Sequence, residues 1–314
     1  MRMNPIVKKD IKVQARSMRI SWGIFVYVAI MALVFFFCMF VIQQNNIYSN
    51  SNIYSDIIDL YPTLGVTQLI ILGVVVPVRT ASAISGEKER QTFDIMMTTS
   101  MTPFSIVMGK VMTAIMQGLF YVLAGMPIMA LAFVIGGLSW SYLFWFFAIA
   151  VLVSFFSASI GIFCSSVCKR SISAVIMSYG FYMVFFALTA IPYLIVQLIG
   201  VTGIGNTLAC WLYLINPAIF LSEFFSWVMS GDSVIYYVMT PGMQGGLTMP
   251  VIHHMWIILS AVMFVAISFL FLGIAAKRIS PISKGKAKKL AARQMAARSN
   301  PAMQNPYDRG NHKQ

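Results

Sequence analysis

Six stretches of this chain are long, apolar and free of charged residues. They cover residues 20–42, 60–78, 111–135, 140–167, 172–199 and 255–276. A helix needs about 20 such residues to cross the hydrocarbon layer of a bilayer. Backbone N–H and C=O groups find no water in that layer, so each stretch must satisfy them internally as a helix. The sequence therefore predicts an all-α polytopic membrane protein with six transmembrane helices.

The basic residues alternate between the two ends of these stretches. All 22 Lys and Arg lie in residues 1–19, in the second and fourth connections, or after residue 276. Cytoplasmic loops are rich in Lys and Arg, so this pattern places both termini in the cytoplasm. Charged residues make up only 10% of the chain, and its net charge is +13. We therefore expect its basic residues to face the lipid of a bacterial cell membrane and not nucleic acid.

The chain outside the stretches suggests three further elements. Residues 1–19 fit a basic amphipathic helix lying on the cytoplasmic leaflet, although a merely topogenic basic leader has the same composition. Residues 200–254 are expected to form an extracellular segment with short helices in the outer leaflet. Residues 277–314 form a basic cytoplasmic tail, the last part of which is polar enough to be disordered.

The second connection carries the strongest functional signal. Ser85 is a suitable N-cap for a short cytoplasmic helix over about residues 86–101. Glu87 and Glu89 would then lie in its first turn, where carboxylates interact favourably with the helix dipole. The sequence predicts a second cap at Thr102, directly before a proline in the first turn of the third span.

One face of the predicted connecting helix is apolar. Its residues recur at helical spacing and are Phe93, Met96, Met97, Met101 and Phe104. Such a helix either anchors the loop to lipid or projects into another protein, with Phe93 as the buried anchor and the charges as its rim. The pattern alone leaves both interpretations open.

These residues resemble the coupling-helix signature of ATP-binding-cassette exporter permeases of type-2 architecture. The matching positions are Glu87, Lys88, Glu89, Gln91, Thr92, Phe93, Asp94, Thr102, Pro103, Gly109 and Lys110. Gln91 departs from the signature, since glycine is common there. The residues that the resemblance implies in coupling to an ATPase are Glu87, Lys88, Glu89, Arg90, Thr92, Phe93, Asp94 and Met97.

Two other segments resemble the same family. The basic helix after Met3, Asn4 and Pro5 is similar to its N-terminal elbow helix. Asn216 and Pro217, with Glu223 six residues after the proline, resemble its asparagine–proline element after the fifth span.

The resemblance implies a transport subunit without catalytic, cofactor or metal sites of its own. Two permeases, identical or different, would form the translocation path, and separate ATPase subunits would bind ATP and magnesium. The sequence agrees, because a phosphate-binding loop needs G-x-x-x-x-G-K-[ST]. Lys110 is followed by Val111 and Lys286 by Ala287, so neither Gly-Lys pair completes that motif.

Two questions stay open at this level. The small residues of the fourth span fit either close helix packing or a polar translocation surface, and they are Ser154, Ser157, Ala158, Ser159, Gly161, Ser165 and Ser166. The alternatives to an exporter permease are a secondary carrier or channel, or a membrane enzyme or scaffold. Carriers usually keep ionisable residues inside the membrane, and the six stretches have none. The apolar spans favour a lipid, an amphipathic compound or an antimicrobial peptide as substrate.

Overall fold

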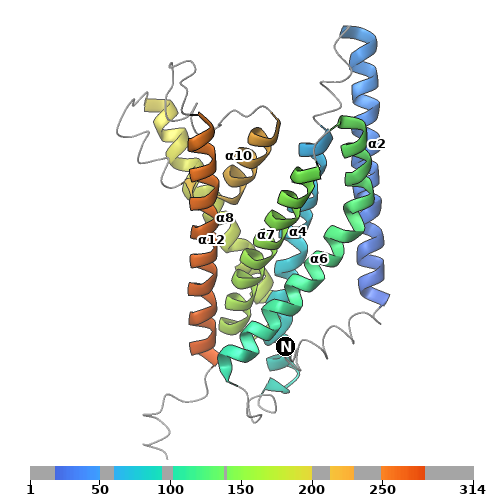
Figure 1. The fold of residues 1–314 in the computed structure, drawn as a ribbon. Helices are drawn as coiled ribbons and strands as arrows, with labels where there is room; N and C mark the ends of the chain where they lie inside the picture. Colours follow the sequence, from blue (N-terminus) through green and yellow to red (C-terminus); the bar gives the residue numbers. More distant parts are fainter. Residues whose placement is uncertain are drawn as a thin grey trace, which may run out of the picture.

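Seven α-helices make up the part of the chain that the computed structural model describes, namely residues 18–49, 60–93, 102–137, 140–199, 213–229 and 249–279. They are α2 (Met18–Ser49), α4 (Leu60–Glu89), α6 (Pro103–Gly136), α7 (Trp140–Val167), α8 (Ser171–Ile199), α10 (Pro217–Met229) and α12 (Met249–Ile279). These ranges contain no strand. The long helices lie alongside one another, and the short α10 lies near one end of the bundle (Figure 1).

Within the described residues, five helical segments are long and apolar enough to cross a membrane. They are Ile20–Asn45, Leu60–Glu89, Pro103–Gly136, Trp140–Val167 and Met255–Ile279. The apolar segment assigned to α8, Ser171–Phe185, is shorter. The predicted all-helical, multi-span architecture is thus confirmed, whereas the count of six spans stays a prediction.

Helix α7 lies at the centre of the bundle, where it contacts α4, α6, α8 and α12. Its small residues are buried. A Cβ added to Gly161 would lie 2.9 Å from Cβ of Thr80 and 3.2 Å from the backbone nitrogen of Ala81. Helices that approach so closely need a residue without a side chain at the crossing. Gly161 therefore serves close packing of α7 against α4. A translocation surface formed by the other small residues of the fourth span stays a prediction.

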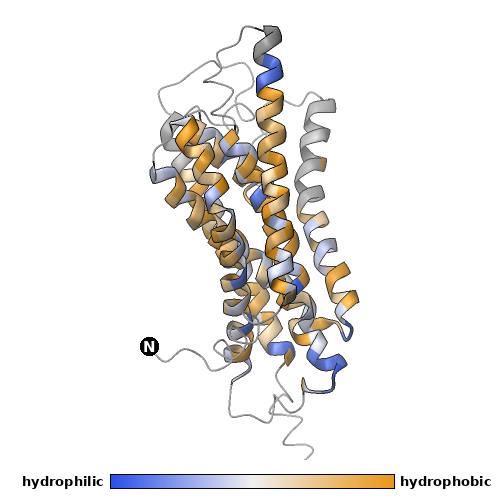
Figure 2. Ribbon diagram, turned by 90° about the vertical axis from the view of Figure 1, so that its right-hand side faces the viewer, coloured by the Kyte–Doolittle hydropathy of each residue, from blue (hydrophilic) through white to orange (hydrophobic). Residues whose placement is uncertain are grey.

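The outer helices present apolar side chains on their exposed faces. On α2, Trp22, Phe25, Phe36 and Phe37 are each at least 65% exposed. Orange residues cover most of the length of the helices in Figure 2, and hydrophilic residues gather near the ends. Such a surface is costly in water and favourable in lipid, as expected for a membrane protein.

One end of the bundle carries the basic residues. Helices α4, α7 and α12 end there, and α2, α6 and α8 begin there (Figure 1). The described basic residues towards this end are Arg19, Arg79, Lys88, Arg90, Lys110, Lys169, Arg170, Lys277 and Arg278. The helix directions agree with the predicted alternation of the connections. We call this end the charged end; its cytoplasmic location stays a prediction.

Four of the helices, namely α2, α4, α6 and α12, are several residues longer than the uncharged stretches that predicted them. α4 continues for eleven residues beyond residue 78, and α2 continues to Ser49. A hydrophobic stretch marks the part of a helix that lies in lipid. The helix itself continues until a residue leaves the helical conformation, for example at a cap. Residues 1–17, 50–59, 94–101, 138–139, 200–212, 230–248 and 280–314 lie outside the described residues. The predicted elbow helix, most of the predicted coupling helix, more than half of the predicted extracellular segment and nearly all of the tail fall there.

Candidate functional site

The charged end of α4 is the candidate site, and its geometry begins with how this helix stops. α4 ends at Glu89, and Gln91 adopts the left-handed conformation with φ 57°. The N–H of Thr92 donates to the carbonyl of Glu87 (3.0 Å), and the N–H of Gln91 donates to the carbonyl of Lys88 (3.2 Å). These two bonds form a Schellman motif, which favours glycine at the left-handed position. Gln91 thus occupies the position at which the family signature commonly has glycine, and the left-handed backbone there suits glycine best.

Lys88 caps the C-terminal end of α7. Its Nζ donates to the carbonyl of Ser166 at 2.6 Å and lies 3.3 Å from the carbonyls of Ser165 and Cys168. The last carbonyls of a helix have no intrahelical partner and form the negative end of its dipole. An ammonium group is therefore favourable at this place, and it ties the end of α4 to the end of α7.

Glu89 joins α4 to the start of α8. Its carboxylate accepts a hydrogen bond from the N–H of Ser171 (2.9 Å) and another from the hydroxyl of the same residue (2.7 Å). Ser171 is the first residue of α8, where N–H groups lack intrahelical acceptors. A carboxylate satisfies one of these groups and interacts favourably with the positive end of the dipole.

Glu87 joins α4 to α6. Its Oε1 lies 2.8 Å from Nζ of Lys110, and the two side chains are 26% and 13% exposed. We call Glu87, Lys88 and Glu89 the clasp. Within one turn of α4, these three residues contact α6, α7 and α8 in succession.

The predicted start of a separate helix at Ser85 is wrong. Ser85 is buried in the continuous helix α4, and its hydroxyl donates to the carbonyl of Ala81 (2.6 Å). The N–H groups of Ile84 and Ser85 both donate to the hydroxyl of Ser165 on α7 (2.9 and 2.8 Å). Ser85 is therefore bonded inside the bundle and does not cap a helix.

The carboxylates of the clasp consequently lie in the last turn of α4 and not in a first turn. The negative end of a helix dipole repels carboxylates, so this position is unfavourable by itself. Lys110 offsets it for Glu87, and the start of α8 offsets it for Glu89. The tertiary contacts of these residues therefore outweigh the local preference on which the prediction was based.

Beyond the clasp, the chain turns outward. Arg90, Gln91 and Thr92 are exposed. Phe93 is half-buried against the core of its own chain, with Nζ of Lys88 at 5.8 Å from its ring centroid. A cleft of about 430 Å³ lies here, and its lining residues are Ser82, Ala83, Gly86, Glu87, Glu89, Arg90, Thr92 and Ser171. Its carboxylates, guanidinium and hydroxyls suit polar contacts with a polypeptide. Asp94 and Met97, the other predicted site residues of this segment, lie outside the described residues.

The family model described as ABC-2 family transporter protein matches residues 43–277. The chain belongs to this family. The matched range covers α4 to α10 and nearly all of α12, so it includes the clasp and the cleft. This ABC-2 family protein is accordingly a multi-pass membrane protein and a component of membrane transport. No curated protein matches the chain.

The asparagine–proline element of this ABC-2 family protein begins α10. Oδ1 of Asn216 accepts a hydrogen bond from the N–H of Ala218 (2.8 Å), and Pro217 is the first helical residue. Asparagine as the N-cap and proline in the first turn are both favourable. Glu223 lies in the middle of α10 and is completely buried. α10 packs on α12 at the end of the bundle opposite the clasp (Figure 1).

The sequence did not identify the intramolecular partners of the clasp. Ser171 has a recognisable signal, since serine directly before an apolar stretch is typical of a helix start. The bonds that Lys88 makes have no such signal, because they go to backbone carbonyls. Among the described residues, no group of three or more His, Cys, Asp and Glu side chains is placed to hold a metal ion.

Proposed function

We propose that this ABC-2 family protein is the permease subunit of an ATP-driven exporter and that the segment after the clasp receives force from a separate ATPase. The observation that carries the proposal is the position of the clasp. It is contiguous with the family-like segment and bonded to α6, α7 and α8. A displacement of residues 90–93 would therefore act on four helices and not on one loop.

The ATPase would be a second polypeptide. The sequence contains no complete phosphate-binding loop, so the partner subunits would bind ATP and magnesium. The exposed Arg90 and Thr92 and the cleft beside them offer the polar contacts for docking. Two permease copies, identical or different, would enclose the translocation path.

A second cavity supports the proposed substrate class. A space of about 690 Å³ lies between α4, α7, α8, α10 and α12, and its lining is mostly apolar. The few polar groups of its lining include the hydroxyls of Ser157 and Tyr179. Such a lining favours a lipid, an amphipathic compound or an antimicrobial peptide over a strongly charged solute.

One observation favours the alternative of a secondary carrier. Glu223 is a fully buried carboxylate close to the apolar cavity, which Phe220, Leu221 and Ser222 help to line. Buried ionisable groups in membrane proteins often couple transport to an ion gradient. A carrier would keep transporting after ATP depletion and would lose its response to a proton or sodium gradient in Glu223→Gln.

The exporter proposal is tested with the chain and an ATPase encoded beside it. The wild-type protein should retain the ATPase during purification, and cells should export an amphipathic fluorescent probe only with ATP. Glu89→Ala and Phe93→Ala should lose most of this export, because the first removes the contact with α8 and the second the packing of the following segment.

Lys169→Ala is the matched control, because it changes an exposed charge at the same end of the bundle. Thermal unfolding of all variants separates loss of coupling from loss of the fold. Normal export by both Glu89→Ala and Phe93→Ala would refute the assignment of this segment. A purified protein that never retains an ATPase would refute the exporter itself.

A further inference from the structure

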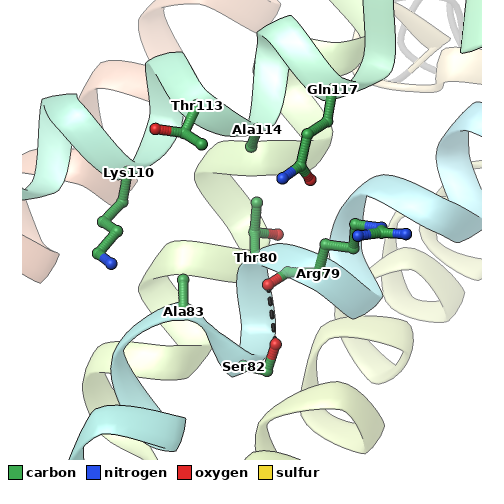
Figure 3. Close-up of a pocket in the computed structure, with 8 residues that line it drawn as sticks. All are labelled: Arg79, Thr80, Ser82, Ala83, Lys110, Thr113, Ala114 and Gln117. Atoms are coloured by element: carbon green, nitrogen blue, oxygen red, sulfur yellow. Dashed lines mark hydrogen bonds between the residues drawn. The ribbon is translucent and has the colours of Figure 1, made fainter. Parts of the chain in front are cut away.

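A polar cavity lies between α4 and α6 close to the charged end. Its volume is about 270 Å³, and α4 lines it with Arg79 and Thr80, and α6 with Lys110, Thr113 and Gln117. Figure 3 shows the side chains of Lys110 and Gln117 extending from α6 towards α4. This cavity is distinct from the cleft beside the clasp and from the apolar cavity among α4, α7 and α8.

The cavity carries an excess of positive charge. Lys110 forms an ion pair with Glu87, so these two charges balance. The guanidinium of Arg79 donates to the hydroxyl of Tyr121 (3.4 Å), and in the described part of the chain it contacts no carboxylate. Neither Arg nor Lys can accept a hydrogen bond, so the group that completes this site must be an acceptor.

Gln117 adds a neutral hydrogen-bond donor to the lining of the same cavity. Its side chain is only 8% exposed and lies in the cavity (Figure 3). Its amide makes no hydrogen bond with any residue that the structure describes. The hydroxyls of Thr80 and Thr113, by contrast, donate to carbonyls of their own helices. The amide of Gln117 is accessible from the cavity, so it can donate to an acceptor bound there.

The cavity lies at the level in the membrane where lipid headgroups are expected. The uncharged stretch of α4 covers residues 60–78, which corresponds to roughly 28 Å of helix. The hydrocarbon layer is about 30 Å thick, so Arg79 lies at its edge, at the level of the headgroups. The cavity is too small for a whole lipid but can hold its phosphate.

We propose that this cavity binds the phosphate of an anionic phospholipid from the leaflet at the charged end. Arg79 and Lys110 would bind the phosphate oxygens, and the amide of Gln117 would donate to the same group. The site adjoins the clasp through Lys110, so lipid binding would also affect the ion pair with Glu87. The inference needs no ATPase and stands apart from the proposed export function.

The test uses the full-length chain alone, in nanodiscs of phosphatidylcholine with a graded fraction of phosphatidylglycerol. Binding is followed by thermal unfolding and by native mass spectrometry of retained lipid. Wild type should be stabilised by phosphatidylglycerol and should retain it. Arg79→Gln should need roughly tenfold more phosphatidylglycerol for the same effect, because the guanidinium would donate charge-assisted hydrogen bonds to the bound phosphate. Gln117→Leu, which keeps both cations, should also weaken retention.

The matched control is Arg278→Gln, which removes an exposed arginine at the same end but outside the cavity. It should retain phosphatidylglycerol like wild type. Equal weakening in Arg79→Gln and Arg278→Gln would overturn the site, since general surface charge would then explain binding. If inorganic phosphate in pure phosphatidylcholine stabilises the protein as much as phosphatidylglycerol does, the ligand is a soluble anion, and the lipid assignment is wrong.

Discussion

Replacing Lys88 by methionine tests whether the clasp holds the charged end together. Methionine has nearly the same length and a similar helix propensity, so the substitution mainly removes the ammonium group. The carbonyl of Ser166 would lose its bond at 2.6 Å, and those of Ser165 and Cys168 would lose their contacts at 3.3 Å. The end of α7 would then keep its dipole without a counter-charge.

The expected loss follows from these contacts. A hydrogen bond from a charged donor contributes about 1.5–3 kcal/mol, and a charge at a helix end contributes about 0.3–1 kcal/mol. Only the bond to Ser166 is short, because 3.3 Å exceeds the usual N–H···O range. Lys88 is also partly exposed, so water can replace part of the interaction. We therefore expect Lys88→Met to lower the free energy of unfolding by about 2 kcal/mol.

Thermal unfolding of the purified protein in detergent measures this effect. A loss of about 2 kcal/mol should lower Tm by roughly 4 to 8 °C in a domain of this size. Lys169→Met is the matched control: Lys169 is an exposed lysine at the same end, so its change should stay within about 0.5 kcal/mol. If both variants unfold at the wild-type temperature, the ammonium of Lys88 does not stabilise the end of α7.

Three further predictions concern the backbone and the packing. Gln91→Gly should raise stability by about 0.5–1 kcal/mol, because it relieves the left-handed residue; a lower Tm would contradict this. Gly161→Ala should lower stability by about 1–3 kcal/mol, since its Cβ would lie 2.9 Å from Cβ of Thr80; an unchanged Tm would show that α4 and α7 can separate freely. Asn216→Ala should cost about 1 kcal/mol and speed hydrogen exchange in α10, whereas Asn216→Asp should not.

The sequence predicts the ends of the helices best where one local feature, a hydrophobic stretch or a cap, determines where the helix begins and ends. The bounds of α7 match the predicted span at both ends, and α8 begins one residue earlier than predicted. The hydrophobic stretch fills α7 completely and α8 except for its first residue, so stretch and helix nearly coincide. The cap at Thr102 is also confirmed, because its side chain accepts a hydrogen bond from the N–H of Ser105. These features depend on neighbouring residues alone.

The clasp could not be predicted in the same way. Glu89 and Ser171 are 82 positions apart, and Lys88 binds backbone carbonyls that every residue type provides. A single sequence contains no local pattern for either contact. Local preference even pointed to the wrong boundary, since Ser85 is a good cap in isolation but is already bonded within α4.

In the proposed exporter, the clasp would separate docking of an ATPase from coupling to it. Lys88 and Glu87 are bonded within the chain, whereas Arg90 and Thr92 remain exposed to a partner. The Schellman motif connects the two groups, because the N–H of Thr92 is bonded to the carbonyl of Glu87. Force applied at the exposed residues would therefore reach the clasp directly. We expect Lys88→Met to retain the ATPase but to export less per ATP hydrolysed, and Arg90→Ala with Thr92→Ala to lose the ATPase itself. If Lys88→Met loses the ATPase as completely as the double variant of Arg90 and Thr92 does, docking and coupling share one set of residues.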